Sequence, residues 1–194
     1  MPFAALPDLS SIETELVALV SQHCRLPNPN VVKRLGGPVF PTIRDQRKRL
    51  TLDHENGLML DDNVSPRWAL FWSHGYAQTH HPKGWTIAHV WAAPKDRDAY
   101  SNLANLCLMP EALGSLSDKL GPLGPYLKYH AYSVYGWHLK SEAVPEMPEG
   151  YEEIRWTYFE EIDDPLAFIH DRLKKLNNQR VKLLRPLMGL DDAQ

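Results

Sequence analysis

Near the start of the chain, apolar residues recur every three or four positions, which is the spacing of one helix face. The positions on this face are Ile12, Leu16, Leu19, Val20 and His23. We therefore expect a helix over about residues 10–25, which Pro27 and Pro29 bring to an end.

The second half of the chain contains two more helical patterns. Residues 125–137 carry aromatic side chains at helical spacing and predict one helix. Asp164 is suited to cap another that runs to about residue 184. The side chains expected to face inward from this last helix are Leu166, Ile169, Leu173 and Leu176.

Short apolar runs bounded by turn residues predict strands in the middle of the chain. The runs cover residues 58–60, 68–72, 85–91 and 106–109, and residues 154–159 alternate as an edge strand would. A short helix is expected over 110–119, and a loop over 30–50 with a short helix near 43–49. The expected fold class is α+β, with helices at both ends and a small strand–strand–helix unit between them.

Composition is that of a globular protein, with 194 residues, 43% hydrophobic and 23% charged. The pattern divides into 1–50 (N-terminal helix and basic loop), 51–140 (α+β core) and 141–194 (acidic linker, edge strand and C-terminal helix), expected to pack as one compact domain. No apolar run approaches the roughly 20 residues of a membrane span, and the N-terminus does not resemble a signal peptide. Cys24 and Cys107 are isolated thiols, which favours a reducing, cytoplasmic setting without a disulfide.

Charge is distributed unevenly, although the net charge is only −3. Residues 33–49 hold six basic side chains against Asp45 alone, and residues 172–185 hold six more with no acid, whereas 142–164 hold nine acids and only Arg155. A basic face of this kind can attract phosphate groups, although charged helix faces also serve solubility. The expected nucleic-acid-binding residues are Arg44, Arg47, Lys48, Arg49 and Lys119.

The strongest chemical pattern combines one histidine with one asparagine. The strand pattern of 85–91 includes His89, and Asn105 opens the next apolar run after a short charged loop. The segments Ile87-Ala88-His89-Val90-Trp91, Asn105-Leu106-Cys107-Leu108 and Leu116-Ser117-Asp118-Lys119 together resemble the ββα-metal (HNH-like) nuclease superfamily. This resemblance covers about 35 residues and implies a ββα-metal-like core with flanking N- and C-terminal helices.

The resemblance implies a metal-dependent endonuclease or phosphodiesterase that cleaves DNA, of the kind found in restriction and defence. His89 would be the general base, and Asn105, or alternatively Asn102, would fix the histidine-bearing loop. Asp118 and His89 would hold a divalent metal, Mg or Mn, with Ni or Zn as alternatives. Ala88 stands where such families carry an acidic residue or a second histidine. The helix position that often carries His or Asn in such families falls near Glu111 or Ser115. The first metal ligand is therefore missing, or it comes from the His80-His81 pair or from Asp96 or Asp98.

Other interpretations of the same residues remain open. In a second interpretation, His89 and Asn105 are structural and bonded to one another, in a non-catalytic HNH-fold binding or interaction domain. In a third interpretation, the protein is an enzyme that acts on a small molecule, and the aromatic side chains of 126–137 line its pocket. DNA is the expected partner and no membrane is expected, while a homodimer stays open.

Overall fold

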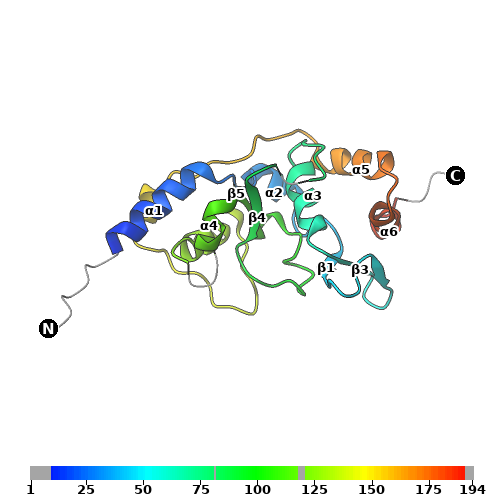
Figure 1. Ribbon diagram of the computed structural model, residues 1–194, viewed down its shortest axis with the longest axis horizontal. Helices are drawn as coiled ribbons and strands as arrows, with labels where there is room; N and C mark the ends of the chain where they lie inside the picture. Colours follow the sequence, from blue (N-terminus) through cyan, green and yellow to red (C-terminus); the bar gives the residue numbers. More distant parts are fainter. Residues whose placement is uncertain (1–9, 81, 118–120, 191–194) are drawn as a thin grey trace.

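Two small sheets lie among helices in this protein, whose computed structural model describes residues 10–80, 82–117 and 121–190 (Figure 1). In the first sheet, β1 runs parallel and β2 antiparallel to the central β3. In the second, β4 pairs antiparallel with β5, so that His89 lies opposite Leu106. The strands are β1 Thr42–Arg44, β2 Thr51–Asp53, β3 Leu58–Asp61, β4 Trp85–His89 and β5 Leu106–Pro110.

The helices surround β4 and β5, with α1 at one end of the molecule and α5 and α6 at the other (Figure 1). The α-helices are α1 Ser10–His23, α2 Pro29–Leu35, α3 Val64–Trp72, α4 Leu123–Tyr135, α5 Pro165–Lys175 and α6 Gln179–Leu187. The 3-10 helices are η1 Leu103–Asn105, η2 Glu111–Ser117 and η3 Tyr151–Glu153. The mixed α+β class is therefore confirmed.

Polar side chains set where several helices begin. Asn28 and Asp164 each precede a proline at the first helical position, and each side chain accepts a hydrogen bond from a backbone amide of the first turn. Asn178 caps α6 in the same way. Gly136 ends α4 with φ of 67°, a conformation that a residue without Cβ adopts at no steric cost.

β5 lies between two clusters of buried apolar side chains. Leu106 and Leu108 pack into the cluster built by α3, α5 and α6, whereas Cys107 and Met109 pack into the one built by α1 and α4. Successive side chains of a strand point to opposite faces, so one strand can join two cores. Because β4 pairs with β5, the two clusters that anchor β5 also hold β4, and with it His89, at a fixed position.

The strand predicted over 68–72 is wrong, because these residues belong to the helix α3. Trp68, Ala69, Leu70, Phe71 and Trp72 are all buried, so the helix is apolar on every side and shows no helical period. A continuous apolar run of this length does not distinguish a buried strand from a buried helix.

The edge strand predicted over 154–159 is also wrong. The segment makes only an isolated bridge between Leu26 and Tyr158, and Phe159 donates its amide to the Leu26 carbonyl. Its alternating pattern reflects packing of Trp156 and Tyr158 against the α1–α4 cluster, without a neighbouring strand to pair with.

Three local features differ from the expected helices. The loop expected over 30–50 contains α2, and the helix expected near 43–49 is replaced by β1 and a turn. The last helix is broken after Lys175, because Asn178 caps a new helix while the Arg185 guanidinium binds the carbonyls of Leu173, Lys174 and Leu176 at the end of α5. Ile12, Leu19 and Leu166, expected on inward faces, are 50%, 49% and 46% exposed.

The remaining elements are confirmed within a few residues: α1, β3, β4, β5 and α4, and the short helix after Pro110 is the 3-10 helix η2. Both cysteines are buried and free. In the described ranges, no helix combines the length and apolar character needed to cross a membrane.

Candidate functional site

His89 is the last residue of β4, and its imidazole is fixed by the loop that follows the strand. Its Nε2 atom lies 3.0 Å from the Tyr100 carbonyl oxygen, and its ring stacks on the Tyr100 ring with centroids 5.7 Å apart. A carbonyl oxygen only accepts, so Nε2 carries the proton. The lone pair of the neutral imidazole then resides on Nδ1, for which the described residues provide no hydrogen-bond partner.

The surroundings of His89 keep this imidazole neutral. Burial lowers its pKa below the ordinary value of 6.5; the hydrogen bond to the Tyr100 carbonyl opposes this, and the positive charge of Arg44 lowers the pKa further. A neutral histidine can accept a proton at neutral pH, as a general base must.

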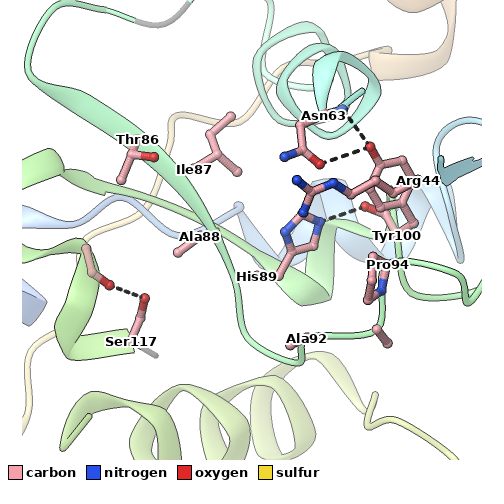
Figure 2. Close-up of a pocket in the computed structure, with 12 residues that line it drawn as sticks. Arg44, Asn63, Thr86, Ile87, Ala88, His89, Ala92, Pro94, Tyr100 and Ser117 are labelled. Atoms are coloured by element: carbon pink, nitrogen blue, oxygen red, sulfur yellow. Dashed lines mark hydrogen bonds between the residues drawn. The ribbon is translucent and has the colours of Figure 1, made fainter. Parts of the chain in front are cut away.

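A hollow of about 370 Å³ lies beside His89, and we call it the His89 hollow. Arg44, Asn63 and Tyr100 lie on one side of His89, whereas Thr86, Ala88 and Ser117 lie on the opposite side (Figure 2). Its lining comprises Arg44, Asn63, Thr86, Ile87, Ala88, His89, Ala92, Ala93, Pro94, Tyr100, Gly114 and Ser117. Residues from β1, β4, the 90–105 loop and η2 therefore meet at this point.

Asn105 holds together the loop that carries Tyr100. Its Oδ1 accepts from the Trp91 amide at 2.7 Å, and its Nδ2 donates to the carbonyls of Trp91 and Ala99 at 3.2 and 3.0 Å. Asn105 is fully buried and does not line the His89 hollow. The interpretation in which His89 bonds directly to Asn105 is wrong, because the ring nitrogen Nε2 binds the Tyr100 carbonyl instead.

Replacing Asn105 by alanine is expected to lower the free energy of unfolding by about 2–3 kcal/mol. The change leaves the buried Trp91 amide without the Asn105 acceptor and removes a donor from two carbonyls. Urea denaturation measures the loss, with Asn56→Ala as the control, because Asn56 is exposed and bonds only within its own turn. A loss below about 1 kcal/mol for Asn105→Ala would contradict a positioning role.

Other polar residues of the loop have local structural partners. Asn102, the alternative to Asn105, caps η1 by accepting from the Ala104 amide and donates to the Asp98 carbonyl. Asp96 accepts from the amides of Asp98 and Ala99. The Tyr100 hydroxyl accepts from the Asn63 amide at 2.8 Å and donates to the Asn63 Oδ1, which ties the loop to the start of α3.

The basic residues predicted to bind nucleic acid occupy different positions. Arg44 lines the His89 hollow, and Arg47 lines an adjoining hollow of about 470 Å³, which we call the Arg47 hollow. Lys48 is exposed on the same turn, whereas Arg49 pairs with Asp62 at 3.3 Å and lines neither hollow. Lys119 lies outside the described residues.

The described residues do not form a set of metal ligands. No three histidine, cysteine, aspartate or glutamate side chains gather anywhere in the described ranges. The described lining of the His89 hollow holds no carboxylate, and Arg44 places a positive charge there. None of His80, Asp96, Asp98, Glu111 and Ser115 lines the hollow; Asp118 and His81, predicted as ligands, lie outside the described residues.

Two other histidines are deeply buried and bonded inside the fold. His74 donates from Nδ1 to the Leu70 carbonyl at 2.7 Å and accepts from the Asn28 amide at 3.0 Å. His130 contacts the hydroxyls of Tyr151 and Tyr158. Burial lowers the pKa of each to about 4, and each is a structural element.

Tyr100 and Asn63 were not identified from the sequence as part of this site. Asn63 adopts φ of 76°, which asparagine tolerates better than most residues, and Tyr100 contributes a backbone carbonyl that any residue would provide. Neither contribution produces a pattern that can be recognised in the amino-acid sequence. No protein-family model, curated protein or solved structure matches the chain.

Proposed function

We propose that this protein hydrolyses a phosphodiester bond of DNA in the His89 hollow, as a divergent nuclease with a ββα-metal (HNH-like) core. The observation that carries the proposal is the orientation of the His89 imidazole. Its Nε2–H points to the Tyr100 carbonyl, so its basic Nδ1 remains for a water molecule in a hollow that also contains Arg44. The sequence resemblance places the same histidine in the role of base.

In the proposed reaction, Nδ1 of His89 takes a proton from the attacking water, whose oxygen forms a bond to phosphorus. The bond from phosphorus to one sugar oxygen breaks, and that oxygen leaves and takes a proton from solvent. The Tyr100 carbonyl stabilises the resulting imidazolium through the Nε2–H bond, and Asn105 keeps Tyr100 in place by holding the Trp91 and Ala99 carbonyls. Protonation of His89 beside Arg44 is unfavourable in the empty site, since both groups are then positive. A phosphate group bound between them would offset this repulsion.

A divalent metal ion, Mg or Mn, is the cofactor that the resemblance implies, and it would act as a Lewis acid on the phosphate. The described lining does not fit such an ion, because it offers an arginine and no carboxylate. The proposed reaction therefore contains no step through a metal, and nicking in the presence of EDTA tests whether a metal is required.

The purified protein is expected to nick supercoiled plasmid, and His89→Ala and His89→Gln are expected to slow nicking by about 10²–10⁴-fold. The glutamine amide can still donate to the Tyr100 carbonyl, so His89→Gln is expected to keep a melting temperature close to that of the unmodified protein. Reactions with Mg²⁺, Mn²⁺, Ni²⁺, Zn²⁺ or EDTA establish whether a metal is needed. Undiminished nicking by the folded His89→Gln protein would exclude His89 as the base.

The second candidate function is a non-catalytic DNA-binding domain of the same fold. It is favoured by Ala88, which occupies the strand position before His89 and contributes only a methyl group to the hollow. This candidate predicts DNA binding that weakens steeply with salt, with no nicking in any of the reactions above.

A further inference from the structure

Arg44 lies where β1 ends, between the His89 hollow and the Arg47 hollow. Its backbone amide donates to the Pro94 carbonyl at 2.7 Å, which fixes the base of the side chain against the 90–105 loop. Its side chain lies beside His89 and Asn63 (Figure 2). Arg44 and Pro94 line both hollows, so the two spaces adjoin at these residues.

The described carboxylates near Arg44 are engaged by other groups. Asp61, its neighbour on β3, is fully buried and binds Arg180 and Ser65. Asp45 accepts from the amides of Arg47 and Lys48. Asp62 pairs with Arg180 and Arg49. In the ranges that the structure describes, no carboxylate forms an ion pair with Arg44.

We propose that Arg44 binds the phosphate group that His89 acts on, and that it does so without a metal ion. A guanidinium presents several N–H donors in one plane, which match two oxygens of a phosphate. It supplies the positive charge that a divalent cation would otherwise bring to the phosphate. The inference rests on the proposed function for the identity of the ligand, a phosphodiester.

The adjoining Arg47 hollow indicates a polymer as the ligand. Its lining includes Arg47 and Lys95 in addition to Arg44, and the Asp45 carboxylate there is already bonded to backbone amides. On the other side, a hollow of about 320 Å³ shares His89, Ala92 and Ser117 with the His89 hollow. A nucleic-acid strand can therefore run past His89, with the phosphate held by Arg44 followed by the next one near Arg47 and Lys95.

Fluorescence anisotropy of a short fluorescein-labelled oligothymidylate in EDTA tests this inference. Arg44→Gln is expected to weaken binding at least about tenfold, because it removes a charge-assisted contact. Arg44→Lys keeps the charge but not the planar donors, so its affinity is expected to lie between those of the unmodified protein and Arg44→Gln. Arg155→Gln is the matched control, since Arg155 is exposed in the acidic segment, and it is expected to change the affinity by less than about twofold.

Two results would overturn the inference: equal affinities for Arg44→Gln and Arg155→Gln, or binding by the unmodified protein only when Mg²⁺ or Mn²⁺ is added. Plasmid nicking separates the inference from the proposed function. If the unmodified protein never nicks plasmid but its binding in EDTA is lost on Arg44→Gln, the Arg44 site stands and the proposed nuclease function is refuted. If the Arg44→Gln variant nicks plasmid at the normal rate, the proposed nuclease function stands and the proposed phosphate site at Arg44 is refuted.

Discussion

Replacing Arg180 by methionine is expected to lower the free energy of unfolding by about 3–5 kcal/mol. Arg180 lies in the first turn of α6, and its Nε donates to the Asp61 carboxylate at 2.8 Å while its Nη2 donates to Asp62 at 2.5 Å. Asp61 is completely buried at the end of β3, and the Arg180 side chain is only 12% exposed. Without Arg180, a buried carboxylate loses its counter-charge.

Most of the lost stability comes from leaving the Asp61 carboxylate buried without a counter-charge, and less comes from the lost attraction itself. Burial raises the pKa of Asp61, but the Arg180 charge and the hydrogen bonds from Ser65 outweigh burial, so its pKa lies below the ordinary value. The carboxylate is therefore ionised at neutral pH in the folded protein. Removing one member of a buried ion pair is costly because the remaining charge stays desolvated.

Guanidinium chloride denaturation measures this loss, with Arg49→Met as the matched control. Arg49 pairs with the same Asp62, but its side chain is 65% exposed, and an exposed pair is worth at most about 1 kcal/mol. The double variant Asp61→Asn with Arg180→Met is expected to recover part of the stability, because no buried charge remains. Equal losses for Arg180→Met and Arg49→Met would refute this account of the network.

Acidification from pH 6.5 to 4 is expected to lower the free energy of unfolding by several kcal/mol through His74 and His130. Each has a folded-state pKa of about 4 against an ordinary value of 6.5, because burial disfavours the charged ring. The unfolded chain therefore binds one more proton per histidine within this window. Stability is complete above pH 6.5 and falls as the pH falls, by about 3 kcal/mol for each histidine by pH 4.

Burial is the main reason why the two rings resist protonation. At His74 a hydrogen bond adds to it, because Nε2 accepts from the Asn28 amide and a proton there would set two donors against each other. His130 lies between the hydroxyls of Tyr151 and Tyr158. The pKa of Asp61 lies below 3.8, so its titration falls outside this pH window.

Urea denaturation at several pH values measures how the free energy of unfolding depends on pH. Glutamine does not titrate, so His74→Gln and His130→Gln should each remove a comparable, large part of the slope, even if each variant is less stable at every pH. His89, whose pKa burial also lowers, contributes a part that remains. His23→Gln serves as the control, since His23 is exposed at the end of α1. If neither substitution changes the slope of stability against pH, the acid sensitivity comes from groups other than His74 and His130.

Prediction succeeded for elements whose pattern is local. The helix period of α1 and α4 and the Asp164 cap of α5 are properties of neighbouring residues. β4 and β5 were predicted as strands because turn residues bound their short apolar runs. His89 and Asn105 were singled out together through the family resemblance, and their roles stay a prediction.

Prediction failed where a pattern had more than one physical solution. Trp68–Trp72 is uniformly apolar, and such a run packs equally well as a buried helix or a buried strand. Residues 154–159 alternate as strands do, but an edge strand also needs a partner, and the only bridge there is between Leu26 and Tyr158. The break after Lys175 depends on the Arg185 side chain folding back onto the carbonyls of α5.

The sequence by itself determined the α+β class and most element positions, because these follow from short-range periodicity, and the family resemblance singled out His89 and Asn105 as candidates. The tertiary structure alone decided which groups surround His89: the Tyr100 carbonyl, Arg44 of β1 and Asn63 before α3. It also decided the Arg180–Asp61 pair, whose members are 119 residues apart. Contacts of this kind depend on how distant elements pack, and packing is a property of the whole chain rather than of any segment.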